Sequence, residues 1–149
     1  MAVQFSVTNG LTALAAATAK TMVEMNPGAN TPAELISFDI SSSYLTAATP
    51  ITLLVELVAY TGTGTGTAFT PRRYGQAVGA ASTVVKINDT VEPAGATVVA
   101  GWELILPTGP FSYQWPLGRE YLLNTATFNG IRLTASAVCS ALVNCTIEE

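Results

Sequence analysis

The stretch IRLTASAVCSALVNCTI, Ile131–Ile147, decides the fold of this chain. Every odd-numbered residue in it is apolar, whereas most even-numbered residues are polar. A β-strand points successive side chains to opposite faces, so this period of two gives the stretch one dry face and one wet face. It contains no Gly or Pro, and a two-residue hairpin would move the apolar residues to even positions. We therefore predict one long, bent or bulged strand, or two collinear strands, on the core of an antiparallel sheet.

Further strand patterns occur between turn signals along the rest of the chain. They are Leu35–Ile40, Ile51–Tyr60, Thr83–Ile87, Val98–Leu106 and Phe111–Trp115. In Leu35–Ile40 the alternation places Ile36, Phe38 and Ile40 on one face, and Ile51–Tyr60 is apolar enough to be central in a sheet. About eight short strands with no clear helix predict an all-β fold. The expected architecture is a single-domain antiparallel β-sandwich, jelly-roll-like in its connections.

Two segments leave alternatives open. Leu11–Lys20 is rich in Ala, which suits a helix, but it has no cap and runs into an alternating stretch, so an extended arm is favoured. Residues 1–20 are thus predicted to be an N-terminal arm or a first strand, with the sandwich over residues 21–149. The Gly-Thr alternation of residues 61–67 predicts a flexible exposed loop. A phosphate-binding loop would need a Lys beside a helix start, which this stretch lacks.

Composition restricts the possible partners. The chain has 149 residues, of which 49% are hydrophobic and only 11% charged. So few charges predict that another protein covers part of the surface. The net charge is −4 and the six basic residues are scattered, so neither nucleic acid nor a membrane is an expected partner. The N-terminal residues lack a basic, hydrophobic signal, and synthesis in a cytoplasm is expected.

The residue types that carry most enzyme chemistry are scarce. The chain has no His, and Cys139 and Cys145 would lie about 20 Å apart on an extended strand, so both are predicted to be free, buried thiols. Two Cys without His cannot supply four zinc ligands. The acids fall in separate predicted elements: Asp39, Glu56, Glu103 and Glu120. We therefore expect no enzyme, no cofactor, and no catalytic or metal-binding residues.

Four aromatic residues form the one candidate ligand platform. Phe111, Tyr113 and Trp115 alternate with polar residues, which places their rings on one face, and Trp102 lies in the preceding strand. Such rings can stack on sugars, but aromatic residues at period two are more often core. The sequence favours the core interpretation and leaves a glycan platform as the alternative.

Several segments resemble those of small virion proteins of tailed bacteriophages. They are Ala19–Met25 (AKTMVEM), Leu53–Val58 before the Gly-Thr stretch, Trp115–Glu120 (WPLGRE) and Val143–Glu149 (VNCTIEE). The resemblance is to the capsid decoration type, also called cement or head auxiliary proteins. It implies a structural protein that forms a homotrimer on the outside of the virion head, clamping subunits of the major capsid protein. The low charge agrees with close packing between subunits.

The alternative function belongs to another class. A receptor-binding or fibre-tip module would hold a carbohydrate on Trp102, Phe111, Tyr113 and Trp115. Binding to a glycan array that is abolished by Trp115→Ala would favour this second function.

Overall fold

The chain folds into strands and turns. The structure is a computed structural model that describes residues 2–43, 50–74, 81–106 and 110–149, and these residues contain no helix, hence none that could cross a membrane. The strands are β1 (Gln4–Thr8), β2 (Thr12–Leu14), β3 (Ala19–Asn26), β4 (Glu34–Ser43), β5 (Ile51–Tyr60), β6 (Thr65–Phe69), β7 (Arg72–Arg73), β8 (Val84–Val91), β9 (Thr97–Leu106), β10 (Phe111–Gln114), β11 (Tyr121–Leu122), β12 (Phe128–Ala135) and β13 (Cys139–Glu148).

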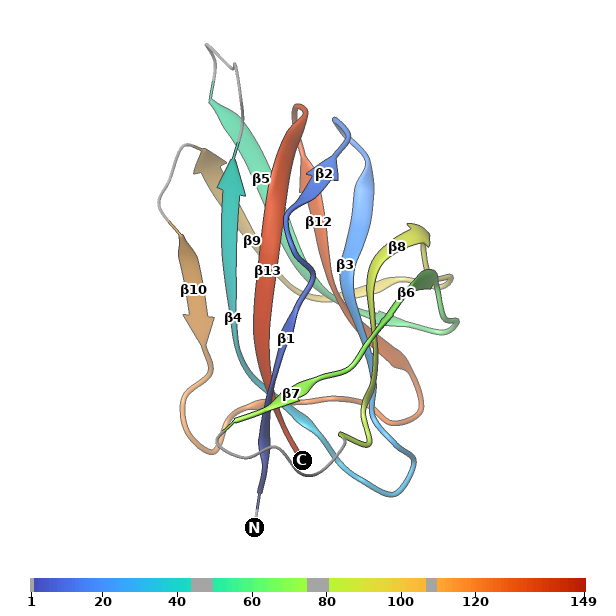
Figure 1. The fold of residues 1–149 in the computed structure, drawn as a ribbon. Helices are drawn as coiled ribbons and strands as arrows, with labels where there is room; N and C mark the ends of the chain where they lie inside the picture. The colour runs from blue at the N-terminus through green and yellow to red at the C-terminus, as the bar shows by residue number, and fades with distance from the viewer. Residues whose placement is uncertain (1, 44–49, 75–80, 107–109) are drawn as a thin grey trace.

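Two antiparallel sheets pack face to face (Figure 1). The seven-stranded sheet has the order β10-β4-β13-β1-β7, with β11 beside β4 and β2 beside β13. The six-stranded sheet has the order β6-β8-β3-β12-β5-β9. The predicted all-β antiparallel sandwich is therefore confirmed, and β5 lies inside its sheet, between β12 and β9, as its hydrophobicity indicated.

The stretch that predicted the fold is divided between the sheets. Its odd-numbered residues are buried as predicted, except Ala137, which is partly buried in the turn between β12 and β13. The prediction of one strand or two collinear strands is wrong, because β12 belongs to the six-stranded sheet and β13 to the seven-stranded sheet. Folding a strand over onto its own apolar face keeps the same alternate residues inside. The unbroken parity therefore reflects an arch between sheets, which the argument against a hairpin did not consider.

A β-bulge in β4 makes the predicted inward face wrong at the start of this strand. Phe38 and Ile40 are buried as expected, but Leu35 takes the inward place predicted for Ile36. The register with β13 skips Ile36, because Thr146 pairs with Ser37 and Ile147 pairs with Leu35. A β-bulge adds one residue to a strand and reverses the alternation beyond it, which explains the change of face.

The N-terminal residues belong to the sandwich. β1 lies between β13 and β7, with Phe5 and Val7 buried in the core, and β2 also pairs with β13. This is the first-strand alternative for residues 1–20, of which Met1 lies outside the described residues. Leu11–Lys20 is neither a helix nor one extended arm: it contains β2, a turn in which Ala17 is left-handed (φ 52°), and the start of β3.

The first and last strands of the described chain, β1 and β13, pair with each other inside the seven-stranded sheet. Gln4 of β1 pairs with Glu148 of β13, and backbone hydrogen bonds join Val3 and Glu149 in both directions at 2.9 and 3.0 Å. Figure 1 shows the termini side by side. The sheet is thus completed by residues from opposite ends of the sequence.

An amide pair links the two sheets near the turn after β1. The Asn9 amide donates to Asn88 Oδ1 of β8 at 2.9 Å, and the Asn88 amide donates to the Asn9 carbonyl at 2.8 Å. Asn9 Oδ1 also accepts from the Val143 backbone N–H at 2.6 Å. Asn88 adopts a left-handed conformation (φ 56°), which Asn tolerates better than most residues. These bonds fix β8 of one sheet against β1 and β13 of the other.

Candidate functional site

The four predicted platform residues gather at one side of the sandwich. Trp102 lies on β9, the edge of the six-stranded sheet, while Phe111 and Tyr113 lie on β10, the edge of the seven-stranded sheet. Figure 1 shows β9 and β10 on the same side. Trp115 follows β10 directly. The fold therefore brings all four residues together where the two sheets open.

The rings of this cluster pack mainly on one another. Trp102 and Tyr113 lie 4.9 Å apart between centroids, and Tyr113 and Trp115 are also 4.9 Å apart in a nearly perpendicular arrangement. Buried Phe38 contacts all four platform rings at 5.1 to 6.0 Å. Each platform residue is only half-buried. The cluster thus seals the open side of the core while leaving ring surface exposed, a geometry compatible with both interpretations.

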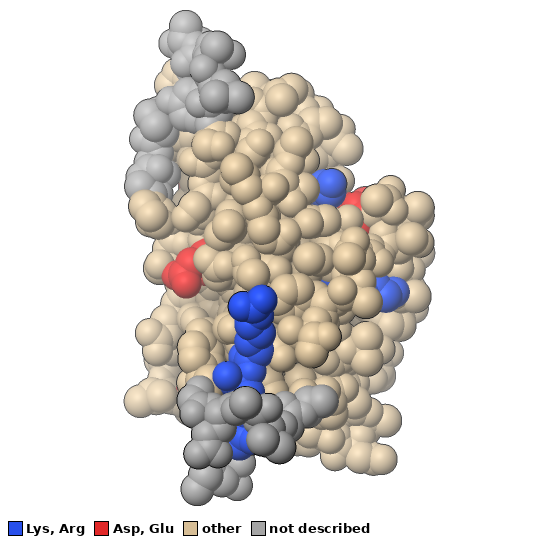
Figure 2. All heavy atoms as spheres, viewed as in Figure 1, with Lys and Arg blue, Asp and Glu red and all other residues tan. Residues whose placement is uncertain are grey.

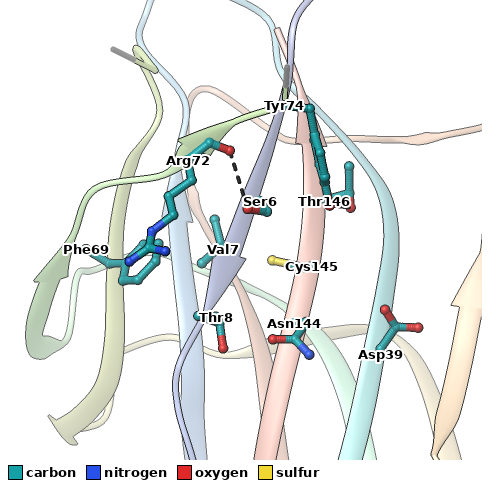
Figure 3. A pocket seen from close by; sticks show the side chains of 10 residues that line it. All are labelled: Ser6, Val7, Thr8, Asp39, Phe69, Arg72, Tyr74, Asn144, Cys145 and Thr146. Atoms are coloured by element: carbon teal, nitrogen blue, oxygen red, sulfur yellow. Dashed lines mark hydrogen bonds between the residues drawn. The ribbon is translucent and has the colours of Figure 1, made fainter. Parts of the chain in front are cut away.

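An open hollow lies on the outer face of the seven-stranded sheet (Figure 3). It measures about 390 Å³ and is lined by Ser6, Val7, Thr8, Asp39, Phe69, Arg72, Tyr74, Asn144, Cys145 and Thr146. The Ser6 hydroxyl donates to the Arg72 carbonyl at 3.4 Å, which fastens the start of β7 beside β1. Arg72 and Asp39 lie at opposite sides of the hollow in Figure 3. Its walls can hydrogen-bond to a protruding polar group, but they supply no activated nucleophile.

The same sheet face has few charged side chains, among them Asp39 of β4 and Glu148 of β13. The outward side chains of β1, β4 and β13 are mostly small hydroxyls and amides: Ser6, Thr8, Ser37, Ser41, Ser43, Ser140, Asn144 and Thr146. Figure 2, which looks onto this face, shows basic atoms in its lower middle and acidic atoms at its left, among mostly uncharged atoms. We call these eight residues the hydroxyl face. Depletion of charge distinguishes the centres of protein interfaces from ordinary surface, so this face suits contact with another protein.

A buried acid lies on the other sheet, at Glu24 of β3. The residue is only 2% exposed. Its carboxylate accepts hydrogen bonds from the Thr63 hydroxyl and the Gly64 backbone N–H, both at 2.7 Å, and lies 3.7 Å from the Lys86 ammonium. These donors stabilise a charged carboxylate in a dry setting. They also tie residues 63–64 to the sheet.

Asp89 of β8 lies beside this ion pair in a different state. It is 3% exposed, and neither of its carboxyl oxygens receives a hydrogen bond from a donor. Burial, followed by the charges of Glu24 and Glu92, raises the pKa of Asp89 to about 7. A carboxyl group that titrates near neutral pH is unusual and often has a functional role, although structural clusters also produce it.

Glu92 completes the acidic cluster through Thr21. It accepts from the Thr21 backbone N–H at 2.7 Å and from the Thr21 hydroxyl at 2.6 Å. The Thr21 oxygen also lies 2.7 Å from the Tyr60 hydroxyl. Burial raises the pKa of Tyr60 to about 12, so this phenol stays protonated. Within the described residues no group of three or more His, Cys, Asp or Glu is arranged to hold a metal ion.

The Gly-Thr stretch is ordered, which corrects the predicted flexible loop. Residues 65–67 belong to β6, which pairs with β8, and Gly64 is buried against Glu24. A Cβ built on Gly64 would lie 2.4 Å from Asp89 Oδ2, and one on Gly66 would lie 2.1 Å from Oδ1. The glycines are therefore needed so that β6 can cover the Asp89 carboxyl group. One feature of the sequence could have predicted this contact. Glu24 is a lone acid within an apolar strand, and a buried carboxylate requires buried partners.

The structure also places the two cysteines and the other acids considered in the sequence. Both cysteines are free and buried, as predicted, and burial raises the pKa of both thiols, that of Cys145 to about 12. Glu56 is paired with Arg132 at 2.8 Å, on the outer face of β5. The register places Glu103 diagonal to Glu56 on β9, where it is exposed.

Two further acids are held by local contacts. Asp39 accepts from the Ser112 hydroxyl of β10, and Glu120 accepts from the Gly118 backbone N–H at 3.0 Å.

No protein-family model matches this chain, and no curated protein is significantly similar to it. The geometry alone therefore carries the functional interpretation.

Proposed function

We propose that this protein is a capsid decoration protein, which binds the outside of a bacteriophage head and stabilises the shell. The hydroxyl face carries the proposal, because its hydroxyl and amide groups cover a sheet surface with few charges and can pair with a partner's backbone and polar side chains. Burying such a face avoids the large desolvation penalty that charged side chains would impose. The major capsid protein is the proposed partner.

The hollow in this face provides a specific anchor point. Arg72 is exposed there and offers a planar set of donors that suits a carboxylate of the partner. A protruding acidic side chain can enter the hollow and pair with Arg72 and the neighbouring hydroxyls. The homotrimer implied by the sequence resemblance is part of the proposal, since several linked copies would gain avidity on a repetitive shell.

Binding to undecorated heads tests the proposal. Heads assembled from the major capsid protein of the same genome are titrated with wild-type protein, with Ser41→Glu on the hydroxyl face, and with Thr97→Glu on exposed β9 of the other sheet. We expect Ser41→Glu to weaken binding at least about tenfold, because an unpaired charge is buried at the contact, and Thr97→Glu to bind normally. Bound heads should resist heating better than bare ones.

Two results would contradict decoration by this face. The wild-type protein fails to bind heads or to shift their disruption temperature, or the two variants bind equally well. Sedimentation of the free protein measures the proposed trimer in the same preparations.

A carbohydrate-binding module is the second candidate, favoured by the exposed ring surface where β9 and β10 meet. If it is correct, a glycan array should show a ligand whose binding is lost in Trp115→Ala and retained in Tyr74→Ala, which removes an exposed ring elsewhere. Glycan binding that survives Trp115→Ala, or no binding at all, would reject this alternative.

A further inference from the structure

The fastening of β6 to the six-stranded sheet depends on acidic groups. β6 is an edge strand that pairs with β8 alone within the described residues. Gly64 lies just before β6 and Gly66 lies within it. Both pack so closely against Asp89 that a Cβ on either would overlap one of its two carboxyl oxygens. A change in the charge of Asp89 therefore acts directly on the position of β6.

The donors around Asp89 are already used by its acidic neighbours. Glu24 takes the Thr63 hydroxyl and the Gly64 N–H, and it forms the ion pair with Lys86. Lys86 itself also donates to the Gly64 carbonyl at 2.9 Å. The Asp89 oxygens are left without a donor, so a charged Asp89 would be a buried ion lacking hydrogen bonds.

A proton on Asp89 removes this conflict. A protonated carboxyl group can donate to a carboxylate, and Glu24 is close enough for its charge to raise the pKa of Asp89. Glu24 is surrounded by donors, whereas no donor reaches Asp89, so the proton belongs on Asp89.

We propose that Asp89 holds a proton that it donates to Glu24, and that loss of this proton unfastens β6 from β8. The proton leaves to solvent, and two adjacent buried carboxylates remain. Their repulsion is relieved when β6 moves away and water reaches Asp89. The strand is thus held by a pH-sensitive contact within the fold.

The other titratable groups around Asp89 do not cancel this effect. They are Lys20 and Glu24 from β3, Tyr60 from β5, Lys86 from β8 and Glu92 after β8. Lys86 favours the ionised form, but burial and the two glutamates outweigh it, and β6 supplies no charged group at its contact glycines. Tyr60 stays neutral, and Lys20 lines a second hollow together with Asp89 and Glu92.

The direction of the pH effect follows from proton binding. The pKa of Asp89 is about 7 in the folded protein, above the usual value of about 3.9 in an unfolded chain. The folded state therefore binds more protons between these values. The contribution of Asp89 to stability is complete below about pH 4 and is lost as the pH rises to about 7 and above.

Amide exchange and carboxyl titration test the proposal together. Exchange of the β6 backbone amides is followed by NMR between pH 6 and 8.5, after correction for the intrinsic pH dependence of exchange. We expect their protection to fall at least about tenfold in the wild type and to stay constant in Asp89→Asn, whose amide is neutral and can donate to Glu24. Asp39→Asn, the same substitution at an exposed site, should behave as the wild type.

The carboxyl carbon signal of Asp89 in the wild type provides a measurement that does not depend on a variant folding. A midpoint near pH 7 supports the proposal, whereas a midpoint near pH 4 overturns it. An equal loss of β6 protection in Asp89→Asn also overturns it.

Discussion

Replacing Ala141 with Asp is expected to lower the free energy of unfolding by about 4 kcal/mol or more, enough to unfold many domains of this size. Ala141 is fully buried on the inner face of β13, between the two sheets. A carboxyl group at this position would lose its water and displace close-packed apolar side chains, and it would meet no charged partner there. Urea unfolding followed by tryptophan fluorescence measures the change.

Ser140→Asp is the matched control for this substitution. Ser140 precedes Ala141, but its side chain points to the outer face, where an added carboxylate stays hydrated. We expect a change within about 1 kcal/mol. If Ala141→Asp and Ser140→Asp unfold at the same urea concentration, the assignment of inner and outer faces to β13 is wrong.

Replacing Gly66 with Ala is expected to destabilise the fold by about 2 to 4 kcal/mol. The new methyl group would lie 2.1 Å from Asp89 Oδ1 and 2.9 Å from the Ile87 carbonyl oxygen. The Asp89 side chain can turn away, but the Ile87 oxygen belongs to the backbone of β8, so β6 itself must shift. Thermal unfolding measured by circular dichroism gives the loss of stability.

Gly101→Ala tests whether any added methyl group on this sheet has the same effect. Gly101 lies on exposed β9, and a Cβ there would meet only the Val55 carbonyl oxygen at 3.6 Å, an ordinary contact. We expect no loss, or a gain of up to about 1 kcal/mol, because Ala restricts the unfolded chain. A Gly66→Ala protein as stable as Gly101→Ala would show that β6 does not cover Asp89 closely.

Local alternation predicted the strands and their buried residues, because one dry face imposes a period of two wherever a strand lies on the core. It did not predict which sheet a strand joins. The break at residues 136–138 leaves the parity of Ile131–Ile147 intact, so β12 and β13 looked continuous. The sequence pattern does not predict the bulge at Ile36 either, because it is visible only in the register with β13.

The aromatic cluster was anticipated in part. Period two placed Phe111, Tyr113 and Trp115 on one face, but their contact with Trp102 depends on β9 and β10 being edges of different sheets on the same side. The contacts of Asp89 were not anticipated. They join residues far apart in the chain, and no local pattern encodes a meeting of that kind.

The pairing of β1 with β13 has a consequence for how the protein forms. β1 cannot gain its partner until β13 has left the ribosome, because Gln4 and Glu148 are neighbours in the sheet. Contacts between such distant residues slow the search for the native state, and the apolar β1 side chains stay uncovered during synthesis. β1 therefore gains this partner only after residues 139–148 have been synthesised, and chaperones that shield the early strands would raise the yield of folded protein.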